Sequence, residues 1–452
     1  MNRWKRGLSL ALCALLLLAM AVPALADSPR PYALEIRVNG RSFSVRAYSE
    51  SYEGNLFLSL RDLSQSLTGT EKQFRIDYQA GGTDGEVWTV SRGQSAGASG
   101  SVQTALAPYA VSLRLWRNRI FVDGGERRYY TYRSDDRDLY MALADVQLML
   151  DLTASYDDDG VLRLETDSPF LPDPWELLRE DYFGAVNAVL VGDADTGEIL
   201  FSHNRVWRYP IASVSKLVTW LLLAEAVDEG SLSWQDTVTV SAKASTLSWS
   251  ADGVIGMAAG AQIPAEELMQ AMMLASSNEC ALALAEYAAG SEEAFVARMN
   301  ERAKELGLRS ARFYTPHGLP SYSGSAITGK RQNAMSAEDL FRLSTFILHE
   351  HPELTELTEK QYINLSKLSF STANSNPLVF NVPGVNGLKT GSTNRAGYCV
   401  VASLPLTLEG ETHTLVTVVL GAETAELRGQ CAEMLLRYAQ NYYLEHGFAQ
   451  VE

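Results

Sequence analysis

The chain has 452 residues, of which 46% are hydrophobic and 20% are charged, a composition typical of globular proteins and a length sufficient for two or three domains. Its formal net charge of −16 at pH 7 excludes the overall basic surface that binds nucleic acid, so no nucleic-acid partner is predicted.

The first 26 residues have the pattern of a secretory signal peptide. Basic residues precede an apolar stretch from Leu8 to Val22, and Ala24-Leu25-Ala26 supplies the small residues of a cleavage site. Because the apolar stretch is short for a bilayer span, we expect cleavage, a mature chain that starts at Asp27, and secretion from the cell. The alternative is an uncleaved membrane anchor.

The residues that follow, 27–168, contain an internal repeat. Residues 55–63 (NLFLSLRDL) return 83 positions later as 138–146 (DLYMALADV), and the tripeptide 38–40 (VNG) returns as 122–124 (VDG). Each repeat is predicted to form a hairpin that turns at Asn-Gly or Asp-Gly, followed by a short strand, a helix and a strand.

The last strand of the first repeat is placed at residues 74–77, and its counterpart in the second repeat at 161–164. The sequence thus predicts a small two-repeat α+β module over residues 27–168. Three prolines mark a linker at residues 169–174.

Residues 31–166 resemble the repeat modules called copper amine oxidase N-terminal-like domains, which are common on exported proteins of Gram-positive bacteria. The resemblance implies a spacer or a contact with cell-wall polymer. Residues 27–166 contain no histidine and no cluster of metal-ligand type, so no metal is predicted there.

Residues 175–452 are predicted to form a second domain. Its strands are expected near its two ends, at residues 187–192, 199–202, 397–403 and 412–420. Helices dominate from residue 213 to about 348, and residues 423–444 have the pattern of a long closing helix. Terminal strands in one sheet with helices between them predict an α+β domain.

The cysteines argue against a disulfide framework. Cys13 lies in the signal segment, which leaves the odd number of Cys280, Cys399 and Cys431. Their apolar surroundings in the sequence predict three buried thiols.

The first chemical motif is Ser213-Val214-Ser215-Lys216, which follows Tyr-Pro-Ile-Ala and opens an apolar helix. Residues three apart share a helix face, so the Ser213 hydroxyl and the Lys216 amine are expected to meet. A serine becomes a nucleophile when a base lies within about 3 Å. A lysine acts as that base only when burial or a neighbouring positive charge keeps it neutral. Taken alone, the motif more often represents a helix cap with a surface lysine.

Two further motifs follow in order, Ser276-Ser277-Asn278 and Lys389-Thr390-Gly391. A hydroxyl in the second motif is suited to relay a proton, and its asparagine to hold a substrate amide. A strand carrying the third motif would present Lys389 and Thr390 to a carboxylate. Gly391 would let a ligand approach the backbone closely.

The Ser392 N–H is expected to serve as an oxyanion donor together with that of Ser213. Alone, the second and third motifs would represent a polar loop and a solvated turn.

Order, spacing and context of the three motifs agree at once, and this combination is found in penicillin-binding proteins and class A β-lactamases. Residues 185–436 resemble the serine D-alanyl-D-alanine carboxypeptidases, the low-molecular-mass penicillin-binding proteins of peptidase family S11. Shared segments include YPIAS before the first lysine, PHGLP at 316–320 and GLKTGST at 387–393. The chain departs from many relatives in having Ser277 and Glu279 on either side of Asn278.

This resemblance implies a serine β-lactamase/penicillin-binding-protein-like transpeptidase fold, with an antiparallel sheet, flanking helices and a helical subdomain. It implies that Ser213 is the acyl-forming nucleophile, Lys216 its base and Ser276 part of the proton relay. The implied substrate-binding residues are Asn278, Lys389, Thr390, Gly391 and Ser392. His317 is interpreted as part of a structural loop; a general base is the alternative for it.

The implied substrate is the D-Ala-D-Ala end of a peptidoglycan stem peptide, and the implied covalent inhibitors are β-lactams, with no cofactor and no metal. The protein is therefore expected to be secreted and associated with the cell wall. One alternative is a serine β-lactamase, which in class A deacylates with a glutamate after the second motif; the corresponding residues 309–320 contain none. The other is a non-catalytic wall-binding protein, against which the intact motifs argue.

Overall fold

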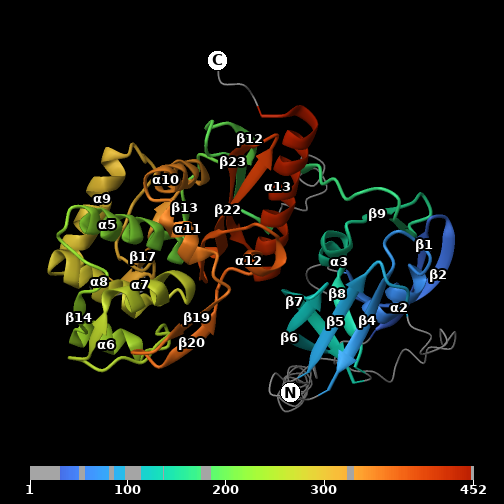
Figure 1. Cartoon of the computed structure of the whole chain (residues 1–452), viewed down its shortest axis with the longest axis horizontal. Coiled ribbons are helices and arrows are strands. Elements are labelled where there is room, and N and C mark those ends of the chain that lie inside the picture. Colours follow the sequence, from blue (N-terminus) through green and yellow to red (C-terminus); the bar gives the residue numbers. More distant parts are fainter. Residues whose placement is uncertain are drawn as a thin grey trace, which may run out of the picture. The chain divides into compact units, whose positions relative to one another are not determined.

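The computed structural model describes residues 31–49, 56–80, 86–96, 113–135, 137–174, 185–322 and 330–448. The signal peptide predicted at residues 1–26 lies outside them. The chain divides into two compact units, one comprising Met1–Gly124 and Tyr129–Pro169, the other Gly125–Arg128 and Phe170–Glu452. Figure 1 shows the first in blue to teal and the second in green to red.

The first unit is built on one sheet with the strand order β4-β5-β6-β7-β8-β3-β2-β1-β10-β9. Its strands are β1 (Tyr32–Val38), β2 (Arg41–Ser49), β3 (Leu56–Ser59), β4 (Phe74–Gln79), β5 (Val87–Arg92), β6 (Leu113–Val122), β7 (Gly125–Ser134), β8 (Leu139–Ala142), β9 (Thr153–Tyr156) and β10 (Leu162–Glu165). Two helices, α2 (Leu60–Ser66) and α3 (Leu143–Leu150), contribute Leu63 and Val146 to the hydrophobic core on one face of this sheet.

The two repeats are interlocked within the sheet. Strands β3 and β8 pair antiparallel at its centre, with Phe57 opposite Ala142. The last strand of each repeat pairs in parallel with the first strand of the other, β5 with β6 and β10 with β1. Each repeat therefore completes the sheet of its partner.

The hairpin turns form where the sequence predicts them. Asn39 and Gly40 have φ of 46° and 79°, and Asp123 and Gly124 have φ of 50° and 81°. Two consecutive positive φ values are the requirement of the tight hairpin turn that Asn-Gly and Asp-Gly favour.

One correspondence between the repeats is wrong. Residues 74–77 lie in β4, the first strand after α2, whereas 161–164 lead into β10, the second strand after α3. The counterpart of β4 is β9. The chain after α2 runs through residues 67–73 before β4, but only residues 151–152 separate α3 from β9, so the offset of 83 between residues 55–63 and 138–146 does not extend past the helices.

The second unit contains an antiparallel sheet in the order β12-β11-β23-β22-β21. These strands are β11 (Ala188–Asp193), β12 (Ile199–His203), β21 (Gly387–Thr393), β22 (Gly397–Leu408) and β23 (Glu411–Ala422). Helix α13 (Ala425–His446) packs on one face, where Val400 and Cys431 share a core; α10 (Ala337–Glu350) lies on the other, where Val401 and Phe341 share a larger one. Terminal strands enclosing helices give the predicted α+β architecture (Figure 1).

The remaining elements of this unit form the helical part and short hairpins. The helices are η2 (Ala212–Ser215), α5 (Lys216–Asp228), α6 (Ala242–Ser248), α7 (Ala265–Leu274), α8 (Asn278–Ala289), α9 (Glu292–Glu305), α11 (Glu353–Thr358) and α12 (Leu378–Asn381). The paired short strands are β13 (Tyr209–Pro210) with β18 (Ala334–Met335), β14 (Thr237–Thr239) with β15 (Gln262–Pro264), β16 (Ser321–Tyr322) with β17 (Lys330–Arg331), and β19 (Tyr362–Leu365) with β20 (Phe370–Ala373). Among the described residues, no helix combines the length and apolarity that a membrane crossing requires.

Candidate active site

Ser213 lies in a tight turn between Pro210 and an apolar helix. Pro210 ends β13, η2 carries Ser213, and α5 begins at Lys216. The Ser213 Oγ lies 2.7 Å from the Lys216 Nζ, as expected for side chains three residues apart on one helical face. The structure thus brings the predicted hydroxyl and amine into hydrogen-bond contact.

Lys216 is fully buried and makes two further contacts. Its Nζ donates to Asn278 Oδ1 at 2.8 Å and to the backbone carbonyl of His317 at 2.7 Å. Burial lowers the pKa of Lys216 well below its ordinary value, and the positive charge of Lys389 lowers it further. Both effects favour the neutral amine.

The neutral amine has a defined orientation in this site. It carries two N–H groups and one lone pair. The His317 carbonyl accepts only, and Asn278 is fixed with Oδ1 toward Lys216 because its Nδ2 donates to the Asp252 carbonyl at 2.8 Å. When the amine is neutral, these two acceptors engage its two N–H groups, and its lone pair is then available to the Ser213 hydroxyl.

Ser276 links the second and third motifs. It follows α7 and adopts φ of 61°, a left-handed conformation that is uncommon for serine. Its Oγ accepts a hydrogen bond of 2.9 Å from the Lys389 Nζ. Ser277 caps α8 by accepting the Cys280 N–H, so the residue between the two predicted site residues is a structural cap.

Lys389 and Thr390 lie on β21, the edge strand of the second-unit sheet. Lys389 is almost fully buried; burial, and then the charge of Arg428, lower its pKa to about 7. The Thr390 Oγ1 lies 3.1 Å from the Oγ of Ser375, an exposed residue outside the three motifs. This edge thus offers an amine and hydroxyls suited to an anionic group.

Gly391 packs closely against the backbone of the Ser213 turn. A Cβ at this position would lie 2.8 Å from the backbone nitrogen of Ser213 and 2.8 Å from the carbonyl oxygen of Ile211. The backbone of the Ser213 turn, rather than a ligand, therefore occupies the space beside Gly391. The following residue, Ser392, is exposed next to this contact.

The ring nitrogens of His317 contact residues other than Ser213 and Lys216. Its Nδ1 accepts the Leu319 N–H at 3.1 Å, and its Nε2 lies 3.6 Å from Glu292. Burial, then the charge of Lys216, lower the pKa of His317 to about 3. The imidazole is thus a neutral part of the loop, while its carbonyl contacts Lys216.

Four contributors were missed by the sequence analysis. They are the His317 carbonyl, Ser375, Arg428 and Glu279, whose carboxylate raises the pKa of Lys216 against burial. Backbone atoms and single residues far from a motif carry no pattern in one sequence. The position of Glu279 directly after Asn278 was the only available signal.

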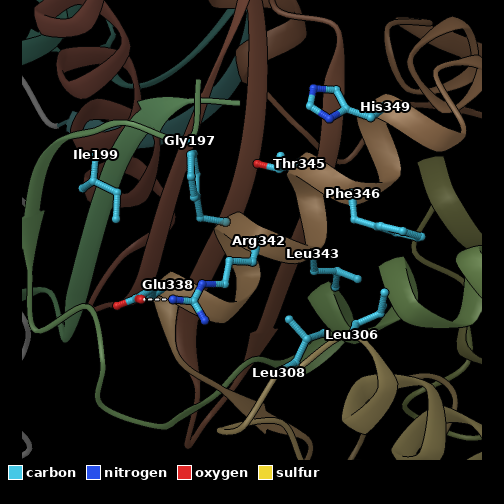
Figure 2. Close-up of a pocket in the computed structure, with 11 residues that line it drawn as sticks. Gly197, Ile199, Leu306, Leu308, Glu338, Arg342, Leu343, Thr345, Phe346 and His349 are labelled. Atoms are coloured by element: carbon cyan, nitrogen blue, oxygen red, sulfur yellow. Dashed lines mark hydrogen bonds and ion pairs between the residues drawn. The ribbon is translucent and has the colours of Figure 1, made fainter. Parts of the chain in front are cut away.

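A cavity of about 490 Å³ lies elsewhere in this unit, and no motif residue lines it. Figure 2 shows its wall formed by one side of α10, with Leu306 and Leu308 below and Gly197 and Ile199 opposite. Arg342 pairs with Glu338 at its edge. All three cysteines are buried free thiols, as predicted.

Within this geometry, the Ser213 hydroxyl meets a buried amine whose pKa is lowered, and a second buried lysine, Lys389, stands beside the Ser276 hydroxyl. Such a set can form and break an ester on Ser213 while holding a substrate carboxylate at Lys389.

Comparison with known proteins yields one family match. A family model described as D-alanyl-D-alanine carboxypeptidase, peptidase S11, matches residues 179–424. D-alanyl-D-alanine carboxypeptidase DacF of Bacillus subtilis is 34% identical over 268 residues, covering 58% of this chain and 64% of that protein. DacD of Escherichia coli is 31% identical over 283 residues, covering 61% and 66%. The chain spans just under two thirds of the length of these relatives.

Solved structures support the same fold. A peptidoglycan synthesis regulatory factor (PBP3) from Streptococcus pneumoniae is 28% identical with a TM-score of 0.51, covering 57% of this chain and 73% of that one. Penicillin binding protein 6B from Escherichia coli is 29% identical with a TM-score of 0.50, covering 56% and 77%. The second unit therefore has the penicillin-binding-protein transpeptidase fold.

Proposed function

The chain belongs to the D-alanyl-D-alanine carboxypeptidase family, peptidase S11, and from that membership we propose that it removes the terminal D-Ala from peptidoglycan stem peptides through an acyl-enzyme on Ser213. The observation that carries this proposal is the buried Lys216 Nζ, which lies 2.7 Å from the Ser213 Oγ and is held there by Asn278 Oδ1 and the His317 carbonyl.

In the proposed acylation, the Ser213 Oγ attacks the carbonyl carbon of the D-Ala-D-Ala peptide bond while Lys216 accepts the hydroxyl proton. The Ser213 N–H lies in η2, just before α5, and, with the Ser392 N–H on β21, is assigned to the negative oxygen that develops. Burial of Lys216 favours this proton transfer, because it lowers the pKa of the amine well below its ordinary value.

The leaving D-Ala requires a proton on its nitrogen. We assign its delivery to Ser276, whose Oγ accepts a hydrogen bond from Lys389. The Ser276 hydroxyl gives its proton to the nitrogen as the C–N bond breaks and takes up the proton that Lys216 received from Ser213, which returns Lys216 to the neutral amine. We assign the D-Ala carboxylate to Lys389 and Thr390, and the amide of the preceding residue to Asn278. Water then attacks the ester carbonyl while Lys216 accepts its proton, and Lys216 returns that proton to the Ser213 oxygen as the ester bond breaks and the shortened peptide leaves.

A β-lactam presents a strained amide and a carboxylate in one small molecule, so the same assignment places it on Ser213 with its carboxylate at Lys389 and Thr390. The similarity of the second unit to penicillin binding protein 6B supports this part of the proposal.

The test combines covalent labelling with peptide turnover. Purified protein incubated with benzylpenicillin is expected to gain the mass of one penicilloyl group on Ser213, and to release D-Ala from a D-Ala-D-Ala pentapeptide. Ser213→Ala is expected to abolish both. Labelling of that variant at full strength would exclude the assigned nucleophile, and rapid nitrocefin turnover without a stable adduct would favour a β-lactamase.

For the first unit, we propose a copper amine oxidase N-terminal-like module that contacts cell-wall polymer, on a chain exported by its signal peptide. The hairpin–strand–helix order shared by the two repeats supports the module, and the apolar N-terminal stretch supports export. The full chain is expected to sediment with insoluble peptidoglycan more strongly than a chain beginning at residue 170. Equal sedimentation would contradict wall contact, and a secreted N-terminus other than Asp27 would contradict the cleavage site.

A further inference from the structure

Glu279 is a fully buried carboxylate directly after Asn278, at the start of α8. Its Oε1 accepts the backbone N–H groups of Val254, at 2.9 Å, and Ile255. Its Oε2 has no hydrogen-bond partner among the described residues. A carboxylate so thoroughly removed from water is costly unless its acceptor bonds are used, and here they tether the segment 254–255.

The neighbouring residue holds the same segment. The Asn278 Nδ2 donates to the Asp252 carbonyl at 2.8 Å, which leaves Asn278 Oδ1 for the Lys216 Nζ at 2.8 Å. The orientation of the Asn278 amide thus depends on where the Asp252 carbonyl lies. That carbonyl is two residues from the first N–H that Glu279 holds.

We propose that Glu279 is a positioning residue: by anchoring residues 254–255 to the start of α8, it places the Asp252 carbonyl that orients Asn278 and, through Asn278, the Lys216 amine toward Ser213. The proposal rests on the function proposed above. Glu279 itself touches neither Ser213 nor a substrate group; it acts through one backbone segment and one amide.

The charge of Glu279 has a second, separable effect. Burial and the Lys389 charge lower the pKa of Lys216, whereas Glu279 and Cys280 raise it. His317 is the remaining titratable side chain at this amine, and its own depressed pKa keeps it neutral above pH 5. Removing the carboxylate charge while keeping its length is therefore expected to lower the pKa of Lys216 further.

Two substitutions separate anchoring from charge. Glu279→Asp keeps the charge but withdraws the oxygen by one methylene, whereas Glu279→Gln keeps the reach and an acceptor oxygen but loses the charge. The measurements are the second-order rate constant of acylation by a fluorescent penicillin from pH 5 to 9, and amide hydrogen exchange of residues 249–256 by mass spectrometry. Glu433→Gln, at a buried glutamate on α13, is the matched control and is expected to change neither.

Glu279→Asp is expected to be acylated by penicillin about tenfold more slowly than wild type, or slower still, at every pH. Small misplacements of reacting groups lower rates by this much or more. It should also speed exchange at residues 254 and 255 by about tenfold, as local opening becomes easier. Glu279→Gln should retain slow exchange and move the acid limb of the acylation profile to lower pH.

If Glu279→Asp is acylated at the wild-type rate, the proposal is overturned, whether or not its hydrogen exchange becomes faster. If that variant does not fold, Glu279→Gln decides: fast exchange, or an acid limb that does not move, would contradict the assignment. If penicillin does not label the wild-type protein, or labels Ser213→Ala fully, the proposed function is contradicted instead. The positioning role is then contradicted as well, because it rests on that function. The exchange data would still report whether Glu279 anchors residues 254–255.

Discussion

At the residue scale, the site holds two buried lysines with different tasks. Lys216 is engaged by two carbonyl oxygens, whereas Lys389 donates to a hydroxyl and to the Thr390 carbonyl. The first is suited to accept a proton. The second serves as a carboxylate partner only while it is charged.

Acylation by penicillin is therefore expected to depend on pH in two directions. The acylation rate should rise with pH as Lys216 loses its proton. It should fall above about pH 7, because burial and the charge of Arg428 lower the pKa of free Lys389 to about 7 and the carboxylate then loses its cationic partner. The measurement is the apparent penicillin affinity and acylation rate between pH 5 and 9.

Arg428→Gln provides the check on this prediction. Removing the like charge should move the alkaline limb upward by about half a pH unit, the size expected of one partly screened neighbour. An alkaline limb that stays in place would assign it to a group other than Lys389.

At the element scale, the closing helix α13 is fastened to the sheet by a buried polar cluster. Asp193 on β11 is fully buried and accepts hydrogen bonds from His413 Nδ1 at 2.6 Å and from the Tyr443 hydroxyl at 3.1 Å. Phe448, just after α13, stacks on His413 at 3.8 Å between ring centroids. Three elements thus depend on one carboxylate.

The cluster predicts a pH-dependent contribution to stability. Burial alone would lower the pKa of His413, but its hydrogen bonds to Asp193 and Glu411 raise it above the ordinary value. Because the folded pKa is raised, the contribution is complete below the unfolded pKa near 6.5 and is lost as pH rises through the folded pKa.

His413→Gln should therefore lower the free energy of unfolding by on the order of 1 kcal/mol more at pH 5.5 than at pH 9. Urea unfolding at both pH values measures this difference. His446→Gln, on the last turn of the same helix, is the control; an equal loss at both pH values for His413→Gln would contradict the ion-pair explanation.

At the scale of the whole molecule, the two units use polar residues differently. In the second unit they form the proposed active site and the separate cluster around Asp193. In the first, Asp138 from the second repeat accepts hydrogen bonds from Arg46, at 2.9 Å, and Ser59 of the first repeat. Burial is the main cause that raises the pKa of Asp138 to about 6, against the opposing charge of Arg46. This buried contact joins the interlocked repeats.

Asp138→Asn is expected to destabilise the first unit by about 3 kcal/mol, because removing one partner leaves a buried arginine short of negative charge. All residues assigned to acyl transfer belong to the second unit, so penicillin acylation at 25 °C should remain within about twofold of wild type, as for independent sites. Differential scanning calorimetry and labelling test the two halves of this prediction. Loss of labelling, or an unchanged unfolding profile, would contradict it.

The sequence by itself determined the features that depend on local chemistry. The hairpin turns form at Asn39-Gly40 and Asp123-Gly124 because those residues tolerate positive φ. The three-residue spacing brings Ser213 and Lys216 together because a helical turn places them on one face. The order of strands and helices in the second unit follows from hydrophobic periodicity in the same way.

Only the tertiary structure decided the features that join distant segments. The parallel pairing of β5 with β6 and of β10 with β1 has no local pattern. The contacts of Lys216 with the His317 carbonyl and of Gly391 with the Ser213 turn involve backbone atoms, which every residue type possesses. Local propensities specify the elements, whereas burial of a shared core selects which backbone atoms of those elements meet.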